Sequence, residues 1–168
     1  VIQGAMMAGA EPIIAVDILD NKLELSKQFG ATHTVNSSQV DPVKAIQELT
    51  DGQGTHYAFE AIGLVSDPFK QSILCTRKRG GTVYVGHAPV NTPVDFDARI
   101  LFLEKTVICS FYGTCRPRVD FPRLLALYKA GKLKLDELVT RIYPLEEVNE
   151  AFTALSQGEV ARSVLDLA

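Results

Sequence analysis

Features that would assign this chain to several other protein classes are missing from its 168 residues. No apolar run reaches the roughly 20 residues that a membrane-spanning helix needs, and no signal peptide is visible. The net charge of −3 lacks the basic excess that nucleic-acid binding usually requires. Internal repeats and low-complexity segments are absent as well. We therefore expect a cytoplasmic protein with neither nucleic acid nor membrane as a partner.

The chain is also poor in cysteine. Cys75, Cys109 and Cys115 are an odd number and contain no C-x-x-C pair, which favours reduced thiols in a cytosolic protein over a disulfide framework. Cys109 stands inside an apolar, strand-like run, and this context predicts a packing role. Because no metal-ligand spacing is present, we assign no metal ligand to this chain.

The composition that is present is that of an ordinary globular protein, with 46% apolar and 22% charged residues. Strand-like and helix-like segments alternate along the chain, as they do in βαβ units with a parallel sheet. We expect Asp20 to cap one of the helices, and Asp41 with Pro42 to open another. Strands are predicted at residues 12–17, 33–35, 56–60, 82–86 and 106–111.

The segment 12–17 is the most informative part of the sequence. Pro12-Ile13-Ile14-Ala15-Val16-Asp17 reads as a buried strand that ends in a carboxylate. In a dinucleotide-binding βαβ unit, the acid after the second strand binds the adenosine ribose, and its charge disfavours NADP. The glycine-rich phosphate loop belongs roughly 20 residues upstream of that acid. We therefore expect an α/β, doubly wound parallel-sheet Rossmann domain that lacks its first strand and glycine-rich loop, with two interior edges unpaired.

Other interpretations of these residues stay open at this point. Asp17 can instead cap a turn, and methyltransferases that use S-adenosylmethionine share the same strand-and-acid geometry. Lys22 could reach the ribose or the phosphates, or it could be a solvated helix lysine. Gly63, Gly86 and His87 follow strand ends, where open α/β sheets bind ligands, although glycines there also serve as plain turn residues.

Three further titratable residues receive no chemical role. Glu60 ends the predicted strand 56–60 and has no obvious partner in the sequence, so we interpret it as structural. His33 and His56 stand at the starts of strands, which is the wrong end for a ligand site in a parallel sheet.

A series of motifs runs in order along the chain and, in combination, resembles zinc-dependent medium-chain alcohol dehydrogenases. The residues Tyr112-Gly113 and Arg116-Pro117-Arg118 look closer to the branch with class III and thiol-linked formaldehyde dehydrogenases. The motifs are Val16-Asp17 with Lys22, Phe29-Gly30-Ala31-Thr32, Phe59-Glu60-Ala61-Ile62-Gly63, Gly80-Gly81-Thr82-Val83 and Gly158-Glu159-Val160-Ala161-Arg162.

The resemblance implies a set of residues that bind NAD. Asp17 would hold the adenosine ribose with Lys22 beside it, Ile62 would pack against the cofactor, and Arg162 would pair with the pyrophosphate. The nicotinamide carboxamide would bind to the main chain of two segments, Val85-Gly86-His87 and Ser110-Phe111-Tyr112. The apolar segment Ile100-Leu101-Phe102-Leu103 would lie at the interface of a dimer.

The resemblance also implies that this chain contains neither catalytic residues nor zinc ligands. In the family, an N-terminal catalytic domain supplies the catalytic zinc, held by two Cys and one His, together with the proton relay. Residues 1–137 would then be a partial NAD-binding domain, and residues 138–168 a tail that returns toward the catalytic domain. Activity is expected from the full-length enzyme and not from the fragment alone.

The leading hypothesis is the cofactor-binding portion of a zinc-dependent, NAD-linked alcohol dehydrogenase, an oxidoreductase acting on an alcohol or aldehyde. One alternative is a zinc-independent NADP quinone or enoyl reductase of the same superfamily, against which Asp17 argues. Another is a non-catalytic dinucleotide-binding module. A methyltransferase is disfavoured because it would leave the family match in the tail, up to Arg162, unexplained.

Overall fold

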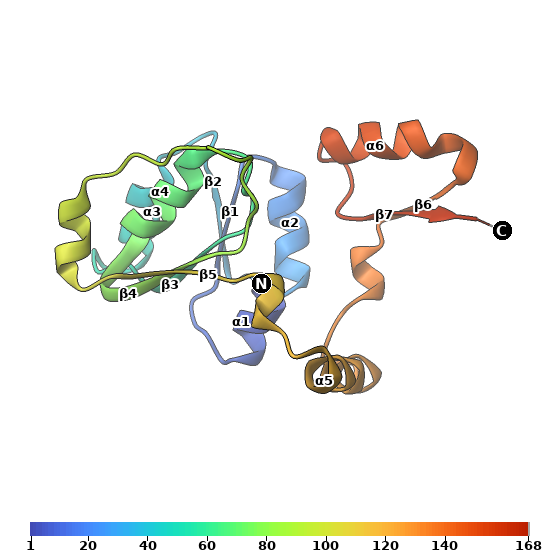
Figure 1. Cartoon of the computed structure of the whole chain (residues 1–168), viewed down its shortest axis with the longest axis horizontal. Coiled ribbons are helices and arrows are strands. Elements are labelled where there is room, and N and C mark those ends of the chain that lie inside the picture. The colour runs from blue at the N-terminus through green and yellow to red at the C-terminus, as the bar shows by residue number, and fades with distance from the viewer. Residues whose placement is uncertain (168) are drawn as a thin grey trace. The chain divides into compact units, whose positions relative to one another are not determined.

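The computed structural model describes residues 1–167 and shows helices that alternate with parallel strands (Figure 1). The α-helices are α1 (Ile2–Met7), α2 (Asp20–Gln28), α3 (Pro42–Leu49), α4 (Ser66–Cys75), α5 (Pro117–Lys129) and α6 (Val148–Ser156). The strands are β1 (Ile14–Asp17), β2 (His33–Asn36), β3 (Thr55–Glu60), β4 (Thr76–Tyr84), β5 (Thr106–Cys109), β6 (Arg141–Pro144) and β7 (Ser163–Asp166). Short 3-10 turns are η1 (Ala98–Leu103), η2 (Tyr112–Thr114), η3 (Asp136–Leu138) and η4 (Leu145–Glu147).

The chain divides into two compact units. The middle unit consists of Val1 with Ser37–Cys115, and the terminal unit consists of Ile2–Asn36 with the residues from Arg116 onward. The middle unit contains one parallel sheet, in the order β3-β4-β5, while the terminal unit contains two parallel pairs, β1-β2 and β6-β7. The predicted α/β fold with parallel strands is therefore confirmed.

Helices α3 and α4 supply much of the buried surface of the middle unit. The Asp41 carboxylate accepts hydrogen bonds from the main-chain N–H groups of Val43 at 2.9 Å and Lys44 at 3.3 Å, and Pro42 takes the first turn. This N-cap is the helix start predicted from the sequence. Ile46 of α3 and Ile73 of α4 are buried, and α4 packs against β3 and β4.

A buried thiol and a half-buried ammonium lie at the end of α4. Cys75 is buried, and burial raises the pKa of its thiol to about 11, partly offset by the positive charge of Lys105. The Lys105 ammonium donates a hydrogen bond to the carbonyl of Ile73 at 2.7 Å, and burial lowers its pKa. In contrast, Cys109 is exposed on the edge strand β5. The expectation of a packing role for Cys109 was wrong, because all four residues of β5 are exposed, so neither face of this strand is covered.

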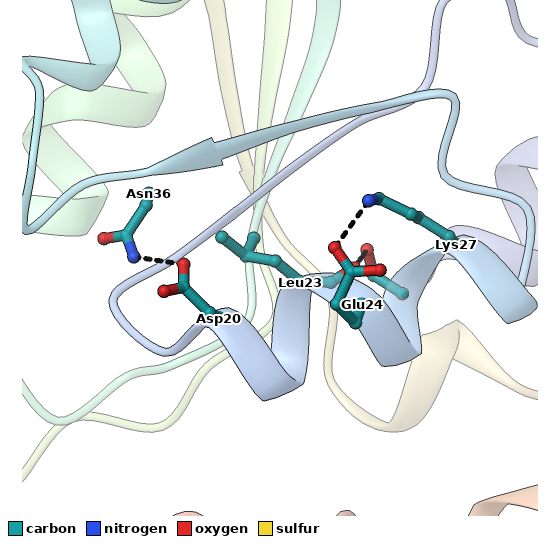
Figure 2. A network of polar contacts seen from close by, with 6 residues as sticks. Asp20, Leu23, Glu24, Lys27 and Asn36 are labelled. Atoms are coloured by element: carbon teal, nitrogen blue, oxygen red, sulfur yellow. Dashed lines mark hydrogen bonds and ion pairs between the residues drawn. The ribbon is translucent and has the colours of Figure 1, made fainter.

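In the terminal unit, α2 follows β1 and covers the β1-β2 pair. The prediction that Asp20 caps this helix was wrong. The helix starts at Asp20 itself, Leu19 takes the N-cap position without a side-chain cap, and the Asp20 carboxylate accepts a hydrogen bond from the Asn36 side chain at 2.6 Å. Figure 2 shows this bond together with the ion pair between Glu24 and Lys27 one turn apart on the helix.

The C-terminal part of the terminal unit forms its own small α/β layer. Strands β6 and β7 pair in parallel, and helix α6 lies against both of them. Their shared core consists of Tyr143, Ala151, Ala154 and Val160, with Leu165 packed against it. The tail from residue 138 onward thus contains the strand β6, the helix α6 and the strand β7.

Strands β1 and β3 each leave one edge unpaired among residues 1–167, as the other outermost strands of the three sheets do. Strand β1 pairs only with β2 in its sheet, and β3 pairs only with β4. These are the two edges that the sequence predicted to be unpaired if the first strand of a doubly wound sheet is missing. Within the same residues, no helix is both long and apolar enough to cross a membrane.

Candidate functional site

The carboxyl ends of the three strands of the middle unit lie side by side, and we call this end of the sheet its carboxyl edge. Glu60, the last residue of β3, lies in register with Tyr84 of β4, and Tyr84 lies in register with Cys109 of β5. Because the three strands are parallel, the segments that follow them leave the sheet at the same edge (Figure 1). Ligands of open α/β sheets bind at such carboxyl ends. The predicted nicotinamide-binding segments, 85–87 and 110–112, both start here.

Gly63 and Gly86 approach each other closely at this edge. Gly63 is buried and has a φ of +77°, which L side chains rarely adopt. A Cβ atom on Gly63 would overlap the main-chain nitrogen of His87, and one on Gly86 would overlap Glu60 Oε2 and the nitrogen of Gly63. Both glycines are therefore required by a main-chain contact between two turns, so the plain-turn interpretation of these residues is insufficient.

The Glu60 side chain is the polar centre of this contact. Its exposed fraction is 3%, and its Oε1 atom accepts hydrogen bonds from the main-chain N–H groups of Ile62 at 2.7 Å and Gly63 at 2.8 Å. The Glu60 carbonyl oxygen accepts from Val85 at 2.8 Å and Gly86 at 3.0 Å. Glu60 had no obvious partner in the sequence because these partners are all main-chain groups, which no side-chain pattern can reveal.

The other residues predicted at this edge are accessible to a ligand. Ile62 is 52% exposed, Val85 and His87 are exposed, and Tyr112 is 84% exposed. The N–H group of Ser110 donates to the carbonyl of Tyr84 at 2.8 Å, which continues the pairing of β4 and β5 by one residue. The structure thus places all the middle-unit residues of the predicted site on one edge, where Ile62, Val85, His87 and Tyr112 are exposed.

Asp17 is the residue of the terminal unit that is predicted to bind the adenosine ribose. It is the last residue of β1 and is half-buried. Its Oδ1 atom accepts a hydrogen bond from the N–H group of Leu19 at 3.0 Å, so the carboxylate does cap the turn that leads into α2. A carboxylate has acceptor capacity on both oxygens, and this capping bond therefore leaves a ribose-binding role chemically feasible.

The C-terminal segment is attached to the start of α2. The Asn21 side chain donates to the Gly158 carbonyl at 2.9 Å, and the Lys22 ammonium donates to the Val160 carbonyl. Gly158 has a φ of +70°, and a Cβ there would overlap the Leu19 side chain. These contacts hold the segment that leads to Arg162, which is exposed, beside the turn after Asp17. Asn21 was not selected from the sequence, and Gly158 was quoted only as part of a family motif, since nothing local indicates a contact so distant along the chain.

No metal centre is formed by the described residues. Among residues 1–167, no group of three or more His, Cys, Asp or Glu side chains is placed to hold a metal ion.

The segment 100–103, which was predicted to lie at a dimer interface, forms part of η1. Its Phe102 side chain is 85% exposed.

Comparison with known proteins gives the family. Residues 1–130 match the zinc-binding dehydrogenase family. The chain belongs to this family. Zinc-binding dehydrogenases with solved structures share the fold as well, and one of them, benzyl alcohol dehydrogenase from Acinetobacter calcoaceticus, is 36% identical with a TM-score of 0.93. That likeness covers 99% of this chain and 46% of the benzyl alcohol dehydrogenase chain.

Two curated relatives extend the family match to the C-terminal segment. The NDMA-dependent alcohol dehydrogenase of Amycolatopsis methanolica is 40% identical over 98% of this chain and 45% of its own length. The protein of Schizosaccharomyces pombe named "Probable S-(hydroxymethyl)glutathione dehydrogenase 1" is 34% identical over 99% of this chain and 44% of its own length. The chain thus spans about half the length of the curated relatives it matches.

Proposed function

We propose that this chain is the NAD-binding portion of a zinc-dependent alcohol dehydrogenase, which transfers hydride between an alcohol or aldehyde and NAD. The observation that carries the proposal is the contact between the Gly63 and Gly86 turns at the carboxyl edge of the β3-β4-β5 sheet. The two glycines let the turns after β3 and β4 pack directly against each other, which brings the segments 62–63 and 85–87 together at the strand ends where open α/β sheets bind ligands. The names of the alcohol dehydrogenase relatives support the same reaction class.

In this proposal, the middle unit orients the nicotinamide ring. The main chain of Val85-Gly86-His87 and of Ser110-Phe111-Tyr112 binds the carboxamide group, while the exposed Ile62 side chain packs against the cofactor. When bound, NAD supplies the hydride acceptor. The role of the protein residues is to hold the ring in one orientation, which lowers the entropic cost of reaching the reactive geometry.

The terminal unit binds the other half of the dinucleotide in this proposal. Asp17 accepts hydrogen bonds from the adenosine ribose, and the guanidinium of Arg162 pairs with the pyrophosphate. Within residues 1–167, Arg162 has no ion-pair partner that would compete for it. Lys22 lies beside this region and, because its ammonium binds the Val160 carbonyl, it supports the Arg162 segment as well as the ribose side.

The zinc that the family name implies does not fit the described residues of this chain, which form no metal-binding group between 1 and 167. No step of the proposal is therefore assigned to the metal here. Its ligands, the substrate pocket and the proton relay belong in the proposal to a catalytic domain outside these residues.

The alternative cofactor is NADP. A zinc-binding dehydrogenase of Sinorhizobium meliloti, 28% identical with a TM-score of 0.80, has a structure bound to NADP. The carboxylate of Asp17 favours NAD, because it would repel the additional phosphate of NADP. The non-catalytic module and the quinone or enoyl reductase have no comparable observation in their favour.

The remaining assignments stay predictions. They are the domain boundary between residues 137 and 138, a dimer formed through Ile100-Leu101-Phe102-Leu103, and a cytoplasmic location. The placement near class III and thiol-linked formaldehyde dehydrogenases agrees with the name of the Schizosaccharomyces pombe relative.

The deciding experiment is a calorimetric titration of the full-length protein with NAD and then with NADP, followed by an assay with benzyl alcohol and NAD. The proposal expects NAD to bind more tightly than NADP and the alcohol to be oxidised. Binding of NAD without turnover of any alcohol or aldehyde would favour the non-catalytic module. Tighter binding of NADP would favour the reductase.

A further inference from the structure

A single residue, Glu60, connects the two turns of the middle unit that carry the predicted nicotinamide site. Oε1 of Glu60 accepts the N–H groups of Ile62 and Gly63, at 2.7 and 2.8 Å. The carbonyl oxygen of the same residue accepts the N–H groups of Val85 and Gly86, at 2.8 and 3.0 Å. Glu60 therefore fixes the main chain after β3 and the main chain after β4 relative to each other.

The second carboxyl oxygen of Glu60 fills the space between these turns. Oε2 is buried and, among residues 1–167, has no hydrogen-bond partner. It lies where a Cβ on Gly86 would overlap it, so it packs directly against the Gly86 main chain. A buried polar oxygen without a partner costs free energy. The carboxyl group is therefore held by its two hydrogen bonds at Oε1 and by packing at Oε2.

The turns that Glu60 holds are otherwise open to solvent. Ile62 and Val85 are exposed, and His87, which follows Gly86 directly, is exposed too. Surface turns with exposed side chains are ordinarily mobile. Glu60 accepts hydrogen bonds from both turns, through its carboxyl group for Ile62 and Gly63 and through its main-chain carbonyl for Val85 and Gly86. These bonds reduce the mobility of the turns before any ligand arrives, and preorganisation of this kind raises affinity.

We infer that Glu60 is a positioning residue for the nicotinamide end of the cofactor: its carboxyl group holds the Ile62-Gly63 turn by two hydrogen bonds and packs that turn against the Gly86 main chain. This inference rests on the proposed function. The inference predicts that loss of Glu60 weakens binding of NAD, which contains the nicotinamide ring, and leaves binding of ADP-ribose unchanged.

The test uses the full-length protein and compares two probes, NAD and ADP-ribose, which lacks the nicotinamide ring. In Glu60→Ala, the N–H groups of Ile62 and Gly63 lose their acceptor, and NAD binding is expected to weaken about tenfold or more. ADP-ribose binding is expected to stay within about twofold, because the sites it occupies are separate from the change. Glu60→Gln keeps Oε1 as an acceptor and is expected to restore part of the NAD affinity.

Controls separate this inference from a general structural effect. Glu48→Ala removes an exposed glutamate of α3 in the same unit and is expected to change neither affinity. Should Glu60→Ala fail to fold, as judged by circular dichroism, Glu60→Asp provides the test. Its carboxyl group is one methylene shorter and cannot hold both N–H groups, so NAD binding weakens severalfold while ADP-ribose binding does not.

The outcomes are distinguishable. A wild-type protein that binds no NAD would overturn the proposed function itself. A wild-type protein that binds NAD, with a folded Glu60 variant that binds NAD equally well, would overturn the positioning role alone. Equal weakening of NAD and ADP-ribose would also overturn it, because it would show that Glu60 supports the whole unit and not the nicotinamide end.

Discussion

The Lys22 ammonium donates a hydrogen bond to the main-chain carbonyl of Val160, 138 residues later in the chain. A second bond, from Asn21 to the carbonyl of Gly158, runs beside it. Together they hold the segment before Arg162 next to the turn that follows Asp17. A lysine that looked like a solvated helix residue or a ligand of the ribose is thus also a structural link between distant parts of the chain.

Lys22→Met should loosen this link. The methionine keeps much of the apolar stem but removes the donor, so the Val160 carbonyl loses its partner. We expect amide hydrogen exchange at residues 158–162 to accelerate about tenfold, which corresponds to the loss of one hydrogen bond to a charged group. Lys44→Met, at an exposed lysine of α3, is the matched control. Unchanged exchange in Lys22→Met would show that the segment is held by its packing alone.

Asp17→Asn should relax cofactor choice. The amide keeps an acceptor oxygen for the Leu19 N–H group, so the turn into α2 is preserved. Loss of the negative charge removes the repulsion of NADP and weakens binding of the ribose. We expect the ratio of NADP to NAD dissociation constants to fall about tenfold or more in the full-length protein. Asp51→Asn, at an exposed turn, controls for net charge; an unchanged ratio would remove Asp17 from the site.

Arg162→Ala should weaken binding of NAD and of ADP-ribose to the same extent. Both ligands contain the pyrophosphate, and a bidentate guanidinium contact to phosphate is worth about 1–3 kcal/mol. The measurement is a titration with each ligand, with Arg118→Ala on α5 as the control. Weaker binding of NAD alone would contradict the assignment, because it would place Arg162 at the nicotinamide end.

Gly63→Ala should destabilise the fold and weaken binding of NAD. The φ of +77° strains any L side chain, and the added Cβ would overlap the His87 nitrogen. Gly52→Ala is a close control, since Gly52 has the same φ of +77° but no atom within 4 Å of its Cβ position. The φ strain costs about 1–2 kcal/mol in both variants, and Gly63→Ala should lose clearly more in a urea unfolding experiment. Equal losses would mean that the two turns separate at little cost.

Cys75 should make stability fall at alkaline pH. The unfolded thiol titrates near 9.0 and the folded one near 11, so between these values the unfolded chain releases its proton first. Stability then decreases as pH rises, by about 1 kcal/mol between pH 8 and pH 10. Cys75→Ala should lack this part of the pH dependence, although removal of the thiol also leaves a small cavity. Parallel unfolding curves of the two proteins at both pH values provide the check, and identical pH dependences would contradict it.

The local sequence determined much of the fold. The alternation of apolar strands with helical segments predicted the parallel α/β arrangement, and the Asp41-Pro42 pair predicted the start of α3 at the observed residue. The strand that ends at Asp17, the glycines at 63 and 86, and the motif around Arg162 identified the candidate site. These signals are readable because each depends on a short stretch of chain, namely strand periodicity, a capping side chain, or a turn that needs glycine.

Tertiary structure decided the rest. Asp20 looked like a helix cap, but its carboxylate bonds to Asn36 in a neighbouring strand. Cys109 looked buried, yet it lies on an edge strand and is exposed. Glu60 looked isolated, because its hydrogen-bond partners are main-chain N–H groups, which every residue except proline has. Those of Val85 and Gly86 reach its carbonyl only because the ends of β3 and β4 are neighbours. Contacts of this kind depend on which strands become neighbours, and that pairing of distant segments has no signature in the local sequence.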